Sequence, residues 1–479
     1  MTTRKTQMSP SRSSTWVLVL AAIASLMAAL DTMVVSTAVT TIRLDLGASI
    51  EQLEWTVNAY NLTLAVLLLP AAASGDRFGR RRMFTVGLAL FVVASAACAL
   101  APDAAWLIGA RAVQGAGAAL LIPNALALVS AAFPAERRGS ALGILQGITG
   151  LAVVAGPVIG GAVAAGIDWE WIFWLNVPIG LAAIPLALAR IDESFGRDTA
   201  LDIGGFALVA SGALGIVWGL VRGNSAGWGS PEVVAALALG AALLAAFVVW
   251  ELRTRQPMLP IRLFRSRAFS SGNAGVFFLF ASLFGAVFFL PQFLQTALGQ
   301  GPLEAALRLG PWTGTLFVVA PIAGALADRI GERPLLVGGL ALQAAGMAWI
   351  ALIAEPGLDY GEMIAPLVVA GVGASMAIPP AASSVVGAVA QDEVGKAAGA
   401  NSMLRELGGV FGIAILVAVF AGAGSYTSAA AFSDGFALAI AASAALSLVG
   451  AIAGLGLPGR PRGTRAAEPA QPAPALETA

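Results

Sequence analysis

Long apolar segments recur along the whole chain and leave few folds open to it. The sequence has 479 residues, of which 58% are hydrophobic and only 11% are charged, whereas soluble domains carry roughly 25% charged residues. A helix needs about 20 mostly apolar residues to cross a bilayer. On that criterion the sequence predicts an all-α membrane protein with about fourteen transmembrane helices.

The expected spans are separated by short loops that contain charges, Gly or Pro. Their apolar cores are Trp16–Val39, Leu53–Ala73, Met83–Ala101, Trp106–Ala131, Gly139–Ala165, Trp171–Ala189, Ile203–Val221, Val233–Leu252, Ser270–Ala297, Leu309–Ala327, Leu335–Ile353, Met363–Val386, Ala398–Gly422 and Phe432–Leu457. Most Lys and Arg residues fall in alternate loops and in both tails, and the loops between hold only Arg43, Arg222 and Arg308. Basic residues in short loops stay cytoplasmic, so we expect both termini on the cytoplasmic side.

A charged loop interrupts the apolar pattern after the second span, at Gly75–Arg82, with the sequence GDRFGRRR. Charge of this kind belongs at a membrane surface, and Gly79 permits a tight reversal of the chain. The motif recurs, weakened, at Gly324–Arg333. This internal repeat indicates a duplicated helical membrane protein, a class that most often consists of transporters.

The spacing of the two motifs predicts the domain organisation. Asp76 and Asp328 are 252 positions apart (328 − 76), whereas six helices with short loops need roughly 200 residues. The surplus fits two additional helices between two six-helix bundles. The expected units are a cytoplasmic tail (1–15), an N-terminal bundle (16–195), two additional helices (196–255), a C-terminal bundle (256–457) and a disordered cytoplasmic tail (458–479).

Composition excludes several classes of function. The net charge is +0, so nothing favours a nucleic-acid partner, and the single cysteine, Cys98, excludes an internal disulfide. The chain has no His, so a proton relay would have to use carboxylates. Phosphate-binding loops, dinucleotide fingerprints, metal-ligand clusters and nucleophile–base pairs are missing from the sequence. We therefore expect no enzyme, no metal and no cofactor, with a proton gradient as the energy source.

Asp31 is the most informative single residue, because a carboxylate inside a span is costly unless it is paired, hydrated or protonated. Counting along the first and fourth helices places Asp31 and Arg111 at similar depth, with Tyr60 and Asn61 near the same level. The group is either a structural ion pair between helices or a site that responds to protons or cations.

Glu406 is a second acid within a span, beside Arg405. Neighbours in sequence point to different faces of a helix, so Arg405 need not pair with it. Glu406 is either a coupling residue or a buried structural acid.

Two further patterns are candidates for the transport path. Gly156, Pro157, Gly160 and Gly161 predict a bendable, closely packed fifth helix, although plain close packing explains them as well. The second and ninth helices carry aromatic and amide side chains that could line a cavity or pack against neighbours. The candidate pocket residues are Trp55, Asn58, Tyr60, Asn61, Gln114, Phe284, Phe288 and Gln292.

The order of these motifs resembles the major facilitator superfamily, and within it the fourteen-helix drug:proton antiporters. The motifs that carry the resemblance are Gly75–Arg81, Arg111-x-x-Gln114-Gly115-x-Gly117, Gly156-Pro157-x-x-Gly160-Gly161, Leu30-Asp31-Thr32, Trp55-x4-Tyr60, Trp169–Gly180 and Leu263-Phe264-Arg265. The chain departs from the family pattern at Ala72, Ser74 and Glu170.

The resemblance implies a role for each motif. Proton coupling falls to Asp31, Arg111 and Glu406, and the fifth-helix glycines with Pro157 form the antiporter motif. A gating loop would latch the two halves on the cytoplasmic side, and its residues are Gly75, Asp76, Arg77, Gly79, Arg80, Arg81, Asp328 and Arg329.

The expected function is therefore proton-coupled antiport that exports hydrophobic, cationic drugs by alternating access. The alternative is a dedicated exporter of one metabolite, such as a self-made antibiotic or siderophore. The expected partners are small amphipathic substrates, protons and lipid, and the chain is expected to act as a monomer in a bacterial cell membrane. An importer is less favoured by the fifth-helix motif, and nothing in the sequence favours a non-transporting receptor.

Overall fold

The computed structural model describes residues 12–196, 201–255, 257–390 and 393–459. Most of the expected tails, 1–15 and 458–479, lie outside these residues. The described part is helical throughout, with no strand. It contains fourteen helical segments that are long and apolar enough to cross a membrane, which confirms the predicted fold class and number of spans.

The helices of the first half are α1 (Arg12–Leu46), α2 (Ile50–Phe78), α3 (Arg80–Ala99), α4 (Ala104–Ala132), α5 (Ala135–Gly166), α6 (Trp171–Trp174) and α7 (Asn176–Arg190). Next come α8 (Ile203–Ala226), α9 (Pro231–Arg253) and a short 3-10 helix, η1 (Ile261–Arg265). The second half contains α10 (Arg267–Thr296), α11 (Pro302–Arg308), α12 (Gly310–Thr313), α13 (Thr315–Ile330), α14 (Glu332–Ile353), α15 (Tyr360–Val386), α16 (Val394–Ala423) and α17 (Ala429–Gly454).

The charged motif is not the loop that the sequence predicted. α2 continues through Asp76 to Phe78, and α3 begins at Arg80, so Gly79 alone connects the two helices. Gly79 has a φ of 106°, a conformation that side chains with a Cβ rarely adopt. A single glycine thus makes the reversal, and most motif side chains are held on helix ends.

Two expected spans are interrupted helices rather than continuous ones. The sixth is divided at Leu175 into α6 and α7, and the tenth comprises α11, α12 and α13, starting before the predicted core at Pro302. Pro178 and Pro311 lie within the first turn after a break. Proline lacks the N–H that a helix interior needs but is tolerated in the first turn, which explains why the helices restart there.

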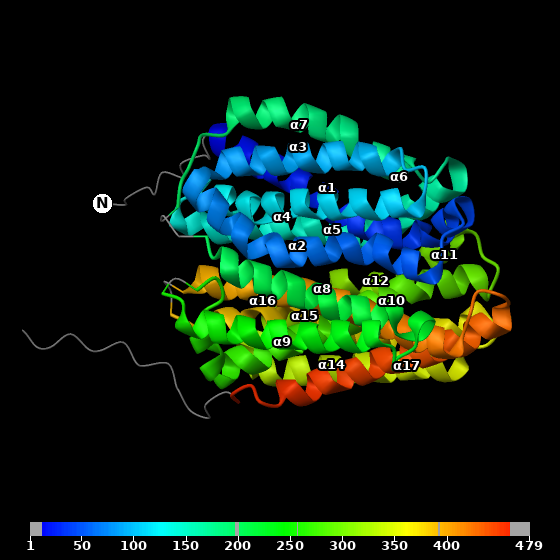
Figure 1. The fold of residues 1–479 in the computed structure, drawn as a ribbon. Helices are drawn as coiled ribbons and strands as arrows, with labels where there is room; N and C mark the ends of the chain where they lie inside the picture. Colours follow the sequence, from blue (N-terminus) through cyan, green and yellow to red (C-terminus); the bar gives the residue numbers. More distant parts are fainter. Residues whose placement is uncertain (1–11, 197–200, 256, 391–392, 460–479) are drawn as a thin grey trace, which may run out of the picture.

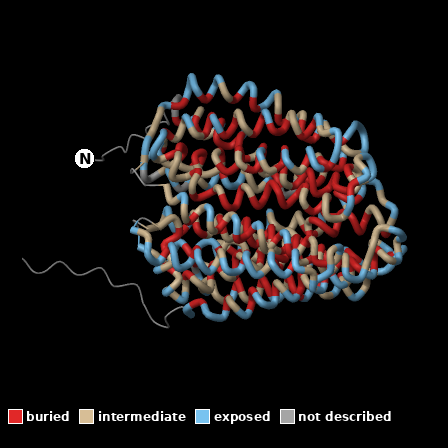
Figure 2. The backbone as a smooth tube through the Cα atoms, viewed as in Figure 1, coloured by how far each residue is buried: buried red, intermediate tan, exposed pale blue. Residues whose placement is uncertain are grey.

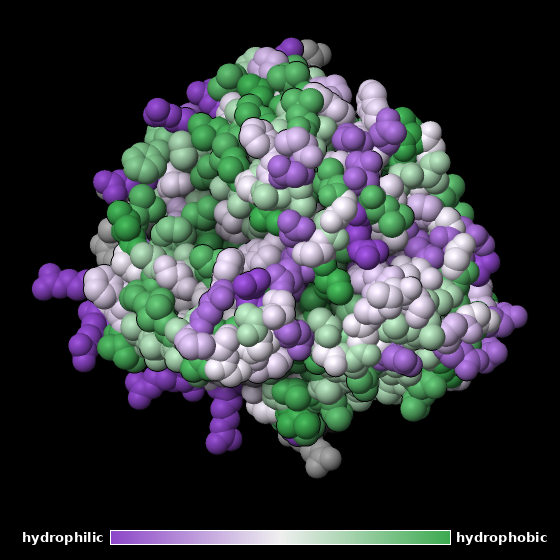
Figure 3. Space-filling view, turned by 45° about the vertical axis from the view of Figure 1, so that its right-hand side comes forward, coloured by the Kyte–Doolittle hydropathy of each residue, from purple (hydrophilic) through white to green (hydrophobic). Residues whose placement is uncertain are grey.

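The helices form two groups that lie one above the other in Figure 1, α1–α7 in one and α10–α17 in the other. α8 packs with α9 and against both α2 and α16, so it spans the junction between the groups. Buried residues gather along the inward faces of the helices (Figure 2). Large apolar side chains such as Leu214, Leu239, Ile322 and Leu438 are exposed on the outward faces. Figure 3 shows broad hydrophobic areas on the flank, as a lipid-facing surface requires.

Glycines of α5 bring it close to its neighbours. A Cβ added at Gly156 would lie 2.4 Å from the Cβ of Met33 in α1, and one at Gly160 would lie 2.8 Å from the carbonyl oxygen of Val34. A Cβ at Gly161 would lie 2.6 Å from the carbonyl oxygen of Pro302 in α11. The motif therefore joins α5 to α1 and, through Gly161, the first half to the second.

The two halves are in contact along α2 and α16 and also at the end of the molecule opposite the charged motif, which we call the far end. There Gln295 of α10 donates a hydrogen bond to the carbonyl oxygen of Thr37 (3.1 Å), and the Arg43 guanidinium lies 4.2 Å from the ring centroid of Tyr426. Nearer the motif end of α5, open space surrounds Gly143 and Gly147. The contact between α5 and the second half is therefore concentrated at the far end.

Replacing Gly161 by Ala tests this contact. We expect a destabilisation of about 1–3 kcal/mol, because the backbone of Pro302 must move to admit the new methyl group. The measurement is the midpoint of thermal denaturation of the detergent-purified protein. The matched control is Gly166→Ala, at the end of the same helix and next to open space. Equal midpoints for the two variants would contradict the packing role of Gly161.

Candidate functional site

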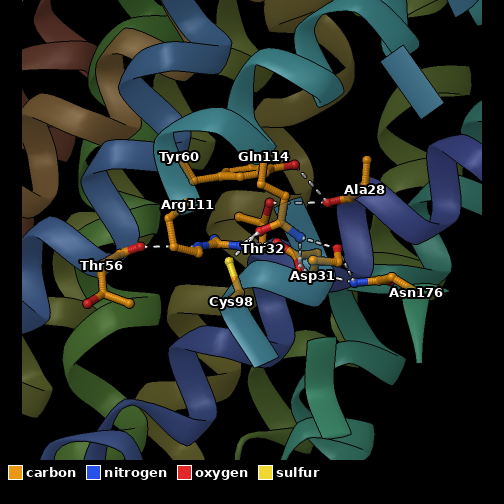
Figure 4. A network of polar contacts seen from close by, with 10 residues as sticks. Ala28, Asp31, Thr32, Thr56, Tyr60, Cys98, Arg111, Gln114 and Asn176 are labelled. Atoms are coloured by element: carbon orange, nitrogen blue, oxygen red, sulfur yellow. Dashed lines mark hydrogen bonds and ion pairs between the residues drawn. The ribbon is translucent and has the colours of Figure 1, made fainter. Parts of the chain in front are cut away.

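An ion pair between Asp31 of α1 and Arg111 of α4 forms the centre of the candidate site (Figure 4). The Arg111 guanidinium donates through Nη1 to Oδ2 of Asp31. Only 2% of Asp31 and 1% of Arg111 are exposed. The predicted proximity of these two residues is present in the structure, deep inside the first half.

The carboxylate of Asp31 also accepts hydrogen bonds from two side-chain amides. Oδ1 accepts hydrogen bonds from Nε2 of Gln114 (2.8 Å) and Nδ2 of Asn176 (3.3 Å). Ser95 of α3 accepts from the same two amides, at 2.7 and 3.4 Å. Both carboxylate oxygens of Asp31 therefore have partners, which are supplied by two other helices, α4 and α7.

Arg111 is held as firmly as its partner. Its Nη1 also donates to Oε1 of Gln114 (2.6 Å), and its Nε donates to the backbone carbonyl of Thr56 in α2 (3.2 Å). Its Cζ lies 4.3 Å from the ring centroid of Tyr60 and 5.7 Å from that of Phe173, within the range of a cation–π contact. The guanidinium thus ties α4 to α1 and α2.

Tyr60 belongs to this network rather than to an open pocket. Its hydroxyl donates to the carbonyl oxygen of Ala28 (3.2 Å), and its ring covers Arg111. Close approach of α4 permits this arrangement, because a Cβ at Gly115 would lie 2.4 Å from the carbonyl oxygen of Tyr60. One turn of α4 therefore carries three contributions to the network: Arg111 provides the cation, Gln114 provides the amide, and Gly115 allows the close contact with α2.

The network contains residues that we did not single out from sequence. Asn176 was part of a recognised motif, but nothing indicated that its amide reaches Asp31. Ser95 lies in an apolar run of α3 that carries no site signal. Both positions depend on how α3 and α7 pack against α1, which local spacing does not reveal.

Chemically, the arrangement is sensitive to the loss of either charge. A buried pair whose geometry is satisfied is tolerated, but removing one partner leaves an uncompensated charge and costs about 3–5 kcal/mol. Protonation of Asp31 would have the same effect on Arg111, which would then seek other partners. The packing of α1 against α4 therefore depends on the presence of both charges.

Glu406 of α16 lies outside this network, in the other half. Oε1 of Glu406 accepts from Nε and Nη2 of Arg405, at 3.0 and 2.7 Å. Although adjacent residues leave a helix in different directions, the long Arg405 side chain folds back to its neighbour. Glu406 is 7% exposed, and the guanidinium also lies 5.7 Å from the ring of Phe280.

The charged motif is stabilised mostly by contacts within the first half. Asp76 accepts from Nε and Nη2 of Arg80, at 2.9 and 2.7 Å, and the backbone N–H of Gly196 donates to its carbonyl oxygen (3.0 Å). The carboxylate of Glu193 accepts from the backbone N–H of Arg81 (2.8 Å). A carboxylate at a helix N-terminus satisfies free N–H groups and favours the helix dipole.

The other gating residues are dispersed. A Cβ at Gly75 would lie 1.7 Å from Oδ1 of Asn124, so this glycine permits close packing of α2 on α4. Arg77 and Arg329 are exposed at the ends of α2 and α13. The side chain of Asp328 lies outside the described residues. Within the described part of the chain, Asp76 forms its hydrogen bonds with Arg80 and Gly196 and not with the second half, where the latch was expected.

The aromatic candidates separate into different surroundings. Phe284 and Phe288 of α10 border a small enclosed pocket that is also lined by Thr32 and Ser36 of α1 and Val57 of α2. This pocket lies between the two halves, as a path for cargo requires. Gln114, in contrast, is fully committed to the Asp31 network.

Two other candidates form contacts near the far end. Gln292 accepts a hydrogen bond from the Tyr426 hydroxyl and donates to the carbonyl oxygen of Phe288 (2.6 Å). The ring centroids of Trp55 and Trp218 are 6.0 Å apart, so Trp55 joins α2 to α8.

Sequence reasoning missed two buried acids, Glu251 of α9 and Glu54, of which Glu54 lies near the candidate site. It is fully buried in α2, and its Oε1 accepts from Nδ2 of Asn58 (3.1 Å). Asn61, one turn further along the helix, is 1% exposed. Glu54 was overlooked because it lies near the end of a span, where acids are usually solvated. Among the described residues, no group of three or more acids or cysteines is arranged to hold a metal ion.

Comparison with known proteins gives consistent results. The family model of the Major Facilitator Superfamily matches residues 21–413 and 272–478. The chain is 34% identical over 408 residues to the tetracenomycin C resistance and export protein of Streptomyces glaucescens, covering 85% of this chain and 76% of that protein. It is 33% identical to the multidrug resistance protein Stp of Mycobacterium tuberculosis, with coverage of 82% and 73%.

Solved structures with low sequence identity share the fold. A bacterial homologue of the human lysosomal transporter Spinster matches with a TM-score of 0.66 at 16% identity, covering 93% of this chain and 97% of that one. A peptide transporter of the POT family matches with a TM-score of 0.69 at 13% identity, covering 91% and 93%. With fourteen apolar helices and relatives from Streptomyces and Mycobacterium, the chain is a multi-pass bacterial cell-membrane transporter, and it belongs to the major facilitator superfamily.

Proposed function

We propose that this protein exports hydrophobic, cationic drugs across the cytoplasmic membrane in exchange for protons, by alternating access. In this proposal the N-terminal and C-terminal bundles are the moving parts, α8 and α9 are the additional helices between them, and both termini face the cytoplasm. The observation that carries the proposal is the buried Asp31–Arg111 pair. Ionisable groups inside membrane spans mark proton and substrate pathways more often than they serve packing alone.

The energy available from this pair is close to that needed to drive a conformational change. Shifting a two-state equilibrium from 1:99 to 99:1 requires about 5.5 kcal/mol. Leaving a buried partner uncompensated is worth about 3–5 kcal/mol. Protonation of Asp31 alone therefore supplies most of the bias, and cargo binding supplies the remainder. Proton release restores the pair and returns the transporter to its starting state.

The relatives support drug efflux as the direction and class of transport. Besides the two proteins described above, relatives include a puromycin resistance protein of Streptomyces alboniger and a multidrug transporter protein, MdtP, of Bacillus subtilis. Each is about as similar to this chain as the others, at 30 to 34% identity. A transporter gives resistance by removing a compound from the cell, so we infer export.

A second candidate is a dedicated exporter of one metabolite. It is favoured by relatives named as a tetracenomycin C export protein and a probable actinorhodin transporter, both from Streptomyces. A panel of structurally unrelated dyes separates the two candidates. Export of several of them supports the multidrug function, and export of none supports the dedicated one.

Proton dependence can be tested in inverted membrane vesicles. We expect uptake of a cationic fluorescent dye to begin when a proton gradient is formed and to stop when an uncoupler is added, because the inward proton flow drives the exchange. Vesicles that lack the protein are the control. Uptake that continues at the same rate with the uncoupler present would contradict proton coupling.

The role of the buried pair is tested by removing one charge and then both. We expect Asp31→Asn to abolish proton-driven dye transport and to destabilise the purified protein by about 3–5 kcal/mol, because Arg111 is left uncompensated. The double variant Asp31→Asn/Arg111→Gln removes both charges. It should regain thermal stability without regaining proton-driven transport.

Measuring both stability and transport distinguishes a proton-coupling role of the Asp31–Arg111 pair from a purely structural role. A pair that serves only to hold helices together predicts that the stable double variant transports dye at the wild-type rate. Dye exchange without a gradient provides the control, since a folded but uncoupled transporter still exchanges its cargo across the membrane.

A further inference from the structure

Three buried polar residues of α2 share one face of the helix, and each has at least one polar atom without a hydrogen-bond partner among the described residues. Glu54, Asn58 and Asn61 are spaced by four and three residues, which places them on the same side. All are at most 1% exposed. Oε2 of Glu54, Oδ1 of Asn58 and both amide atoms of Asn61 have no hydrogen-bond partner in the described structure. Buried polar groups are rarely left unsatisfied, so this face is suited to a ligand.

The face is directed toward the second half. The same helical stripe continues through Ala65 and Leu69, which pack with Met403 and Leu407 of α16. Val57, on the neighbouring side of α2, lines the small pocket between the halves together with Phe284 and Phe288. The polar face therefore lies at the boundary between the two moving bundles, beside the region where cargo must pass.

Glu54 differs from the other two buried acids of the proposed mechanism. Asp31 is paired with Arg111, and Glu406 is paired with Arg405. Glu54 forms no ion pair with any described residue. Its hydrogen bond is to the neutral amide of Asn58. A cationic cargo would have to displace an arginine to reach Asp31 or Glu406, but Glu54 has a free carboxyl oxygen.

Charged groups around Glu54 do not neutralise it. On α2 itself, Glu51 lies one turn nearer the helix end and contacts Nη1 of Arg222 of α8 at 3.3 Å. Arg222 also contacts Glu232 of α9 at 3.3 Å.

Basic groups on the other neighbouring helices are engaged elsewhere. On α4, Arg111 lies against the backbone of Thr56 in the Asp31 network. On α16, Arg405 is engaged by Glu406, and at the far end of α1, Arg43 lies over Tyr426. With no cation in contact among the described residues, an ionised Glu54 would be an uncompensated buried charge, which is unfavourable.

We propose that Glu54, assisted by Asn58 and Asn61, is a site where a proton and the positively charged group of the cargo bind in turn. The inference rests on the proposed export function and deepens it by assigning cargo charge to a specific residue. When the halves separate, water reaches the carboxyl group and the proton leaves. The carboxylate then binds a cationic group, and the asparagine amides accept hydrogen bonds from it. Reprotonation from the other side of the membrane releases the cargo.

Ethidium, a permanent cation, is a suitable probe for binding to the purified full-length protein. We expect its affinity to rise with pH by roughly tenfold per unit in the range where the carboxyl group titrates. Glu54→Gln keeps the shape of the side chain and removes its charge. It should weaken ethidium binding by roughly tenfold or more and abolish the part of the pH dependence that Glu54 supplies, while Glu54→Asp retains part of both.

The matched control is Glu51→Gln, which removes an acid from the rim of the same helix and leaves Glu54 in place. It should change ethidium affinity and its pH dependence little. Correct folding of Glu54→Gln is checked by thermal denaturation and by transport of an uncharged compound. Ethidium binding by Glu54→Gln with wild-type affinity and pH dependence would overturn the inference.

The outcome also distinguishes this inference from the proposed function. Proton-driven export of an uncharged compound, with no ethidium binding by the wild type at any pH, overturns the role of Glu54 and leaves proton-coupled export intact. If proton-driven export of every compound is missing in the wild type, the proposed function itself fails.

Discussion

An unpaired charge is unstable inside a membrane-spanning bundle, and this constraint governs the arrangement of the polar residues in this protein. Asp31 and Arg111 are nearly inaccessible, yet each has several partners drawn from four helices. The surrounding helices are almost entirely apolar, so these contacts largely fix how α1, α2, α4 and α7 pack together. In the proposed mechanism, protonation of Asp31 therefore alters the packing of these four helices.

Close packing transmits such a change to the second half. The glycines of α5 place its backbone against α1 and, at Gly161, against Pro302 of α11. Displacement of α1 therefore moves a helix that directly contacts the other bundle. Because packed interfaces are bistable and deform little, the proposed mechanism uses small shifts at the ion pair to favour one arrangement of the halves over the other.

The same cost of a buried charge applies at the proposed cargo site, but there the acid is not paired with an arginine. The Asp31 and Glu406 carboxylates are satisfied by arginines of the protein itself, whereas Glu54 has only an amide partner. In the proposed mechanism the two kinds of acid have different roles, because Asp31 biases the conformation and Glu54 remains available to the cargo. The Glu54 face lies where α2 meets α16, the junction that must open for cargo to enter.

The sequence by itself determined the number of spans, the repeat of the charged motif and the shared depth of Asp31 and Arg111, because span length and helical rise are local properties. It did not determine that α2 continues to Phe78, that Asn176 and Ser95 complete the network, or that Arg405 folds back on Glu406. It also gave no sign that Glu54 is fully enclosed. These features depend on contacts between helices that are far apart in the chain, and only the tertiary packing brings them together.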